Sequence, residues 1–323
     1  MHNTVNFYSK ILLFGEYALI FGSSALSMPY LKKSGHLDIP ASPTAADAHS
    51  NRNLRSYLLY LQSLLKEDSL NVAMDVDRLE SEINGGLVFR SNIPNGYGLG
   101  SSGSLVAAIY HRYAKENTSH TKLLDEDLQQ LKQDFAHLES YFHGTSSGLD
   151  PLISYLQKAI LVKGSQQLKV VDLPESSELE NAGLFLIDSG QAGKTQPLVN
   201  YFMEQSRQAE YMARILTELI PLNRQSIRAF LAADMKDLLP LTKQLSGFTL
   251  QQLFPMVPSS MVDVWKYGLQ SDDYYLKLCG SGGGGMLLGF TADLSKAAEL
   301  LKDYSLRVVF RFGITTNLMG NVF

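Results

Sequence analysis

The sequence predicts a mixed α+β fold made of two domains, and three observations support this prediction. Short apolar runs typical of β-strands recur along the chain, at residues 10–14, 159–162, 183–187, 286–290 and 307–312. Amphipathic helix patterns lie between them, at residues 53–66 and 121–142. A polar link at residues 174–181 divides the chain and places a boundary near residues 175–185. We therefore expect domains at residues 1–182 and 183–323.

Both helix patterns rest on the spacing of their apolar residues. In residues 53–66, leucines at positions 54, 58, 61 and 65 fall on one helical face. The longer pattern has the spacing 4-3-4-3-4, carried by Leu124, Leu128, Leu131, Phe135, Leu138 and Phe142. Residues 34–53 are polar and rich in Ser, Ala and Pro, so we expect a surface excursion there.

Composition excludes several classes of protein. The 323 residues, 45% of them hydrophobic, can supply two cores, and the formal charge of −4 comes without the basic stripe that nucleic-acid binding requires. No apolar run approaches the roughly 20 residues of a membrane span, and the N-terminus lacks the features of a signal peptide. Cys279 is the only cysteine, which excludes an internal disulfide and a cysteine-based metal cluster. We expect a cytoplasmic protein without nucleic-acid or membrane partners, and a buried, apolar role for Cys279.

The most informative segment is residues 93–104, where glycines and hydroxyl residues crowd ahead of a helix pattern. Residues 86–93 have the character of a strand, and residues 104–114 are good helix formers. Glycine lets the backbone approach an anion closely, and the free N–H groups at the start of a helix attract it. This segment therefore predicts a phosphate-binding loop.

Two segments of the chain resemble well-known phosphate-binding loops, but neither fits such a loop fully. Residues 98–103 match the dinucleotide pattern G-x-G-x-x-G, but residues 94–97 separate them from the strand, and no second strand leads to the nearest acidic candidate, Glu116. Residues 188–195 resemble a Walker A loop that begins with Asp188, where a carboxylate would repel the nucleotide. The alternative there is a strand-to-helix connection with Gly193 as a turn residue.

Charged residues in three further segments are candidates for chemistry. Lys10 is the first residue of the strand-like run 10–14, which ends at the Gly15-Glu16 turn. A lysine beside a strand is usually a surface residue, and this is the alternative for Lys10. Glu139 falls in the last turn of the long helix that Gly144 closes, where the helix dipole disfavours a carboxylate. Magnesium binding would explain it, and a solvated glutamate is the alternative. Asp150 precedes Pro151, at a rigid bend where it could act in catalysis or cap a turn.

Taken in order, these segments resemble the superfamily of small-molecule kinases that includes galactokinase, homoserine kinase, mevalonate kinase and phosphomevalonate kinase (the GHMP kinases). Pro94 and residues 98–102 fit its P-x₄-G-L-G-S-S loop, and residues 10–17 fit its opening K-x₂-L-x-G-E-H/Y motif. Residues 139–150 are similar to the E-x₃-H-G-x₂-S-G-x-D segment of mevalonate kinases, and residues 277–286 to the third, glycine-rich motif. Residues 188–199 resemble the D-[ST]-G-x₄-T segment of mevalonate kinases. The resemblance spans residues 10–289.

The resemblance implies a fold, a cofactor and roles for individual residues. The N-terminal domain would be like domain 2 of ribosomal protein S5, the C-terminal domain ferredoxin-like, and ATP with Mg²⁺ would lie between them. Asp150 would be the catalytic carboxylate and Lys10 would stabilise charge on the transferred phosphoryl group. Residues implied in nucleotide binding are Pro94, Gly96, Gly98, Leu99, Gly100, Ser101, Ser102 and Gly103. Ser102 and Glu139 would hold the metal, with Ser101 as the alternative serine. Residues implied on the substrate side are Glu16, Tyr17, His143, Ser147, Thr195, Gly280, Gly282 and Gly283.

The acceptor implied by the resemblance is a small-molecule alcohol, with mevalonate favoured. Phosphomevalonate stays open because Tyr17 replaces the histidine usual in mevalonate kinases, and because residues 97–104 are similar to phosphomevalonate kinases. A phosphorylated acceptor needs extra cations, for which Lys194 and Lys277 are the candidates. A sugar or amino-acid alcohol is a third alternative, and a non-catalytic ATP-binding paralogue is an alternative of another class. A homodimer is compatible with the sequence, which does not determine the oligomeric state.

Overall fold

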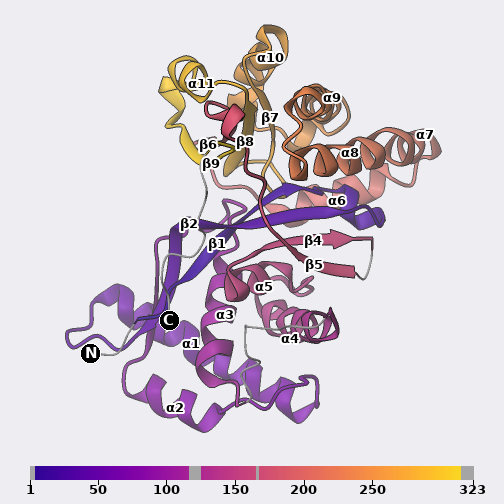
Figure 1. The fold of residues 1–323 in the computed structure, drawn as a ribbon. Helices are drawn as coiled ribbons and strands as arrows, with labels where there is room; N and C mark the ends of the chain where they lie inside the picture. The colour runs from indigo at the N-terminus through magenta and orange to yellow at the C-terminus, as the bar shows by residue number, and fades with distance from the viewer. Residues whose placement is uncertain (1–3, 116–124, 165–166, 314–323) are drawn as a thin grey trace.

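The computed structural model describes residues 4–115, 125–164 and 167–313. These residues form two antiparallel β-sheets with helices packed against them (Figure 1). The sheet from the N-terminal half has five strands and the sheet from the C-terminal half has four. The mixed α+β class predicted from the sequence is confirmed.

In the first sheet the strand order is β1-β2-β4-β5, and β3 also pairs with β2. Its strands are β1 (Phe7–Phe14), β2 (Ala25–Asp38), β3 (Val88–Ser91), β4 (Ala159–Lys163) and β5 (Gln167–Val171). The 14 residues of β2 make it long enough to pair with β1, β3 and β4 at different points along its length. A 3-10 turn at Ala18–Phe21 connects β1 to β2.

Helices of the N-terminal half cover one side of this sheet (Figure 1). They are α1 (Ala45–Lys66), α2 (Val76–Asn84), α3 (Ser101–Tyr113), α4 (Asp125–His143) and α5 (Leu149–Leu156). The apolar faces predicted for α1 and α4 meet in one core with α3 and α5, where Leu58, Leu61, Phe135 and Leu138 are buried. The predicted helix faces are therefore confirmed for most of the residues that the structure describes, but Phe142 at the end of α4 is 37% exposed and does not belong to this core. Leu124 lies outside the described residues.

The second sheet has the order β7-β8-β6-β9. Its strands are β6 (Gly183–Asp188), β7 (Tyr275–Leu278), β8 (Met286–Thr291) and β9 (Arg307–Arg311). The helices around it are α6 (Thr195–Gln205), α7 (Ala209–Arg214), a π-helical turn (Ile215–Leu219), α8 (Ile220–Leu231), α9 (Met235–Gln252), α10 (Val262–Ser271) and α11 (Leu294–Leu300). Short 3-10 turns lie at Ser177–Leu179, Phe254–Met256, Ser259–Met261 and Lys302–Tyr304. Strands and helices follow the β-α-β-β-α-β succession of a ferredoxin-like unit, with several helices between β6 and β7.

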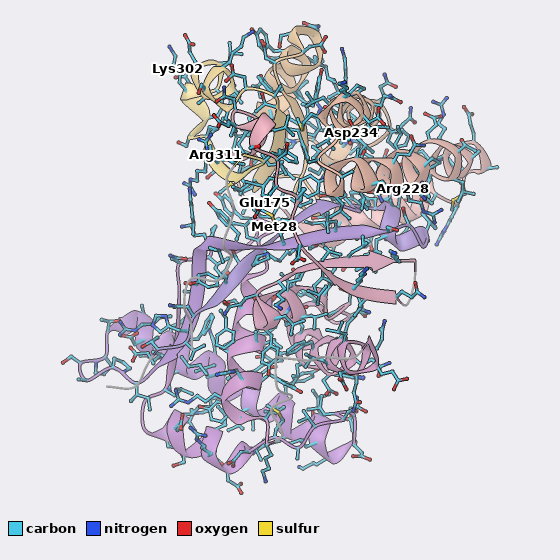
Figure 2. All side chains as sticks on the ribbon, in the orientation of Figure 1. Met28, Glu175, Arg228, Asp234, Lys302 and Arg311 are labelled. Carbon is cyan, nitrogen blue, oxygen red and sulfur yellow. The ribbon has the colours of Figure 1, made fainter. Side chains whose placement is uncertain are left out.

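The two sheets share a core. Phe14 on β1 packs its ring against Phe230 of α8 and Phe290 of β8, with centroid distances of 6.0 and 5.4 Å. Met28 on β2 is buried in the same cluster, and Figure 2 shows it where the two halves of the molecule meet. Strand β1 is consequently held from both sides, which fixes the backbone that carries Lys10.

Among the predicted strands and surface segments, one expectation needs correction. All five predicted strand runs are strands, and residues 88–91 of the predicted strand 86–93 form β3. The surface excursion expected at residues 34–53 is confirmed only for the mostly exposed residues 39–44, because β2 continues to Asp38 and α1 begins at Ala45. Thr44 and Asp47 start that helix with a reciprocal capping box, so a polar sequence here marks a helix N-terminus. Within the described ranges, no helix is long and apolar enough to cross a membrane.

Candidate active site

The predicted phosphate loop leads directly into α3, as the sequence indicated. Gly100 occupies the N-cap position with φ of 73°, a left-handed conformation that favours glycine. No side chain caps the first turn of α3. The Ser101 hydroxyl turns away and donates to Asn95 Oδ1 at 2.8 Å. The helix therefore begins with backbone N–H groups that no side chain caps, at the positive end of its dipole, an arrangement that suits a phosphate.

Lys10 and Asp150 form an ion pair next to this helix start. The Lys10 Nζ to Asp150 Oδ1 distance is 3.2 Å, and the Lys10 backbone N–H donates to Leu99 O at 3.0 Å. Lys10 is only 7% exposed, so the alternative of a surface lysine is wrong. Burial by itself lowers the pKa of the Lys10 ammonium, but the negative groups around it, Asp150 first, outweigh burial and raise this pKa above its ordinary value.

The close packing of α3 on this ion pair depends on small residues. A Cβ atom at Gly100 would lie 3.1 Å from both Asp150 Oδ2 and Lys10 Cγ. A Cβ atom at Gly103 would lie 2.7 Å from the carbonyl carbon of Asp150 and 2.8 Å from the nitrogen of Pro151. Glycine at these two positions lets the helix start, the lysine and the carboxylate share one small space.

Asp150 is positioned by α5 rather than by a loop. The sequence placed it at a rigid bend, but in the structure it lies in the first turn of α5. Pro151 is accommodated there because the first residues of a helix have no intrahelical partner for their N–H groups. The side chain of Asp150 is 31% exposed, so one part contacts Lys10 and the rest is accessible to a ligand.

Glu139 on α4 is buried beside the same helix start. It is 4% exposed, which excludes the alternative of a solvated glutamate. Its Oε1 accepts a hydrogen bond from Ser102 Oγ at 2.8 Å and its Oε2 accepts one from Ser146 Oγ at 2.5 Å. Burial and the nearby Asp150 carboxylate raise the pKa of Glu139 to about 7, although the two hydroxyls and Lys10 act in the opposite direction.

These oxygens are suitable ligands for Mg²⁺. Magnesium prefers hard oxygen ligands and usually takes one or two carboxylates together with phosphate oxygens and water. A buried carboxylate whose pKa is raised gains from a nearby cation, and Ser102 already contacts it. Ser101 is bonded to Asn95 instead, which favours Ser102 as the metal-side serine. Among the described residues, no group of three or more His, Cys, Asp or Glu side chains is arranged to hold a metal ion.

Loops of the C-terminal half lie against the phosphate loop, as expected for the glycine-rich motif. A Cβ atom at Gly98 would lie 2.3 Å from Cys279 O, and the Gly193 N–H donates to Gly96 O at 2.9 Å. Residues 188–195 connect β6 to α6, which is the strand-to-helix connection given above as the alternative to a Walker A loop. Gly280, Gly282 and Gly283 belong to the loop between β7 and β8.

Hydroxyl groups from three segments meet at this loop. Tyr17 Oη donates to Ser281 O at 2.6 Å, and Ser281 Oγ donates to Thr195 Oγ1 at 3.0 Å. Tyr17 and Thr195 were predicted on the substrate side, and the structure joins them through Ser281. Sequence analysis missed Ser281, although it lies within the glycine-rich motif that was recognised.

Three further predicted residues lie in three other places. His143 is exposed, and its Nε2 is 3.1 Å from Ser102 Oγ, on the phosphate-loop side. Ser147 Oγ accepts the Leu149 N–H at 3.3 Å at the start of α5. Glu16 is buried against Lys277, and their Oε1 to Nζ distance is 2.5 Å. Ser146, the second donor to Glu139, was not predicted, although it is part of the segment that contains Glu139 and Asp150.

Comparison with known proteins gives consistent results. Residues 64–158 match the family described as GHMP kinases N terminal domain. The chain is 22% identical to a mevalonate kinase of Archaeoglobus fulgidus over 287 residues, which cover 87% of this chain and 89% of that protein.

Solved structures of kinases share the fold. The mevalonate kinase of L. major, in complex with R-mevalonate, superposes with a TM-score of 0.64 and 17% identity, over 96% of this chain and 95% of that one. The phosphomevalonate kinase of Streptococcus pneumoniae, in complex with phosphomevalonate and AMPPNP, gives a TM-score of 0.63 and 12% identity, over 95% and 98%. The chain therefore carries a GHMP kinase N-terminal domain and has the fold of these kinases, which confirms the resemblance found in its motifs.

Proposed function

We propose that this protein is an ATP-dependent small-molecule kinase that transfers a phosphoryl group to the hydroxyl of mevalonate. The observation that carries the proposal is the Lys10–Asp150 ion pair beneath the uncapped first turn of α3. A helix start that can hold phosphate, a buried lysine and a partly accessible carboxylate are the groups that phosphoryl transfer to an alcohol requires.

In the proposed mechanism, the phosphates of ATP lie at the N-terminus of α3. The acceptor oxygen forms a bond to the γ-phosphorus while the bond from that phosphorus to the β,γ-bridging oxygen breaks, and ADP leaves. Asp150 orients the acceptor hydroxyl or takes its proton. Lys10 holds Asp150 through their ion pair and stabilises the negative charge on the transferred group.

Ser102 and Glu139 are the residues that would hold Mg²⁺. The bound ion would neutralise charge on the phosphate oxygens. The Ser102 and Ser146 hydroxyls orient the Glu139 carboxylate for this purpose. In the same proposal, the nucleotide lies between domains at residues 1–182 and 183–323, and the enzyme works in the cytoplasm.

Two features support mevalonate as the acceptor. The mevalonate kinase relative matches 87% of the chain, and the segment from Glu139 to Asp150 has the residue types and spacing of mevalonate kinases. Phosphomevalonate is the second candidate because a phosphomevalonate kinase has a TM-score of 0.63 and because residues 97–104 are similar to those enzymes.

The decisive experiment is an ADP-release assay with mevalonate, phosphomevalonate, galactose and homoserine as acceptors. We expect turnover with mevalonate, and Asp150→Asn should lower it by at least about 10²-fold while ATP binding stays nearly intact. A wild-type rate in Asp150→Asn would remove Asp150 from the mechanism. Tight ATP binding without turnover of any acceptor would instead favour a non-catalytic, regulatory paralogue.

A further inference from the structure

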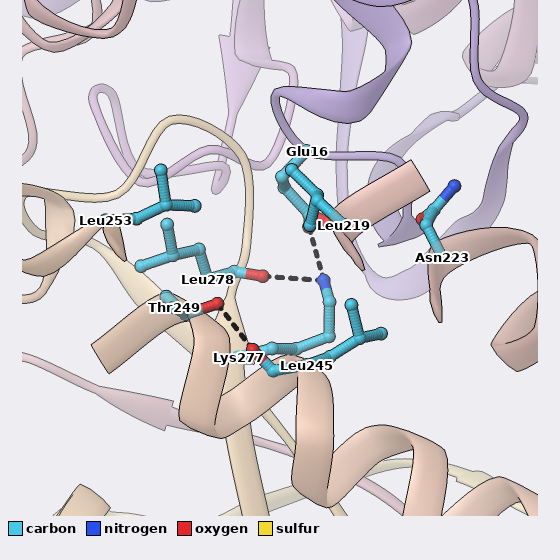
Figure 3. A pocket seen from close by; sticks show the side chains of 8 residues that line it. All are labelled: Glu16, Leu219, Asn223, Leu245, Thr249, Leu253, Lys277 and Leu278. Atoms are coloured by element: carbon cyan, nitrogen blue, oxygen red, sulfur yellow. Dashed lines mark hydrogen bonds and ion pairs between the residues drawn. The ribbon is translucent and has the colours of Figure 1, made fainter. Parts of the chain in front are cut away.

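Glu16 and Lys277 form a buried ion pair that joins two distant parts of the chain. Glu16 follows β1 and Lys277 lies in β7, and their side chains are 8% and 6% exposed. Figure 3 shows the Lys277 ammonium directed at Glu16 and at the carbonyl of Leu278, which it reaches at 2.8 Å. The ammonium also lies 5.9 Å from the centre of the Phe14 ring.

The surroundings of this pair are mostly apolar. Leu219, Leu245 and Leu253 line the same small cavity, whose volume is about 20 Å³ (Figure 3). This is room for about one water molecule, so neither a nucleotide nor an acceptor fits there. Because a buried ion pair stabilises a protein little compared with apolar residues of similar size, its presence here points to a role in fixing a geometry.

The geometry that the pair fixes includes Tyr17. This residue follows Glu16 and adopts φ of 59° and ψ of −39°, which a side-chain-bearing residue avoids unless its surroundings enforce it. Its ring packs against Phe202 with a centroid distance of 4.6 Å, and its hydroxyl donates to Ser281 O. The turn after β1 is thus tied twice to the chain at residues 277–281, to β7 at Lys277 and to the β7–β8 loop at Ser281.

The stretch from Lys277 to Ser281 runs past the phosphate loop. Cys279 O contacts Gly98, and Ser281 Oγ donates to Thr195 at the start of α6. Any movement of Lys277 would therefore be transmitted to the backbone that packs on Gly98 and to the hydroxyl pair of Ser281 and Thr195.

We propose that Glu16 and Lys277 are a positioning pair that holds Tyr17 and Ser281 in place for an acceptor that carries no phosphate group. The proposal rests on the kinase function above and deepens it by naming the acceptor class. Of the two lysines that the motifs offered for an acceptor phosphate, Lys277 has its charge balanced by Glu16, and only Lys194 stays exposed. A phosphomonoester with two negative charges gains little from such a site.

The test is a double-mutant cycle with Glu16→Gln, Lys277→Met and the double variant. Each single variant should raise the KM for mevalonate at least tenfold and leave the KM for ATP within twofold. The double variant should be less impaired than either single variant, because it leaves no unpaired charge in the apolar interior. In Glu16→Gln the positive charge of the buried ammonium is no longer balanced, and although no acceptor can touch it, its field should raise the ratio of kcat/KM for phosphomevalonate to that for mevalonate at least tenfold.

Lys296→Met provides the matched control. Lys296 bonds to Asp273 at 2.6 Å between segments of the C-terminal half, but its side chain is 58% exposed. This variant should keep wild-type KM values. If the single variants lower the melting temperature but leave the mevalonate KM and the acceptor ratio unchanged, the pair has only a structural role and the proposal is overturned.

Hydrogen exchange separates this proposal from the proposed function. Backbone amides of residues 280–285 should exchange at least tenfold faster in each single variant than in the wild type and in Lys296→Met. This measurement needs no turnover, so it tests the pair even if the wild-type protein phosphorylates none of the acceptors. Unchanged exchange in the single variants would show that the pair does not position the loop.

Discussion

Gly103→Ala tests how closely the first turn of α3 must pack on the segment that carries Asp150. The new Cβ atom would lie 2.7 Å from the Asp150 carbonyl carbon, about 0.7 Å closer than the 3.4 Å at which ordinary contact begins. The clashing atoms belong to the backbone of α5, so no side chain can rotate to relieve the contact. Helix α5 must therefore move away from α3 and take Asp150 with it.

The expected change in the free energy of unfolding follows from two opposing effects. Overpacking of this kind costs about 1–3 kcal/mol. Alanine is favoured over glycine within a helix by about 1 kcal/mol, so the net loss of unfolding free energy should be about 0–2 kcal/mol. Activity should suffer more than stability, because a shift approaching 1 Å in a reacting group can lower a rate by about 10²-fold. We expect kcat to fall about 10- to 100-fold by this effect.

The assay is steady-state ADP release combined with urea unfolding, and Gly247→Ala is the control. Gly247 lies within α9, and a Cβ atom there would meet nothing within 4 Å. Gly247→Ala should raise the unfolding free energy by about 0.5–1 kcal/mol and leave kcat unchanged. A wild-type kcat in Gly103→Ala would refute the idea that this glycine positions Asp150, the proposed catalytic carboxylate.

Two further predictions follow from the pKa shifts. The raised pKa of Glu139, about 7 against an ordinary 4.5, means that the metal-free protein loses stability as pH rises from about 4.5 to 7, by at most about 3 kcal/mol. Glu139→Gln should therefore be more stable than the wild type at pH 8 but not at pH 4, and equal urea midpoints at pH 8 would contradict this. The variant should also need more Mg²⁺ for turnover, and an unchanged Mg²⁺ titration would contradict that expectation. Burial raises the pKa of the Cys279 thiol to about 11. At pH 8 the folded protein should therefore react with iodoacetamide at least tenfold more slowly than the urea-unfolded chain. Equal rates would show that the thiol is accessible.

Much of the fold could be predicted because its patterns are local. The leucines of α1 and the 4-3-4 spacing of α4 follow from the helical period, and the strand runs are short and apolar. Strand β2 was not predicted; its C-terminal part, Ser34 to Asp38, is polar and is stabilised by pairing with β1 and β3. Sequence near a strand does not reveal partners that lie far along the chain.

The sequence by itself determined which residues are candidates for the chemistry, because their types and spacing form ordered motifs: the glycines before α3, Lys10, Glu139 and Asp150. Tertiary structure decided how these residues pair. Ser102 meets Glu139 across 37 positions and Lys277 meets Glu16 across 261, and neither contact has a local signal. Such contacts arise only where packing of the two sheets brings the segments together and removes water from the charged groups, and this packing turned Lys277 from a candidate phosphate ligand into the partner of Glu16.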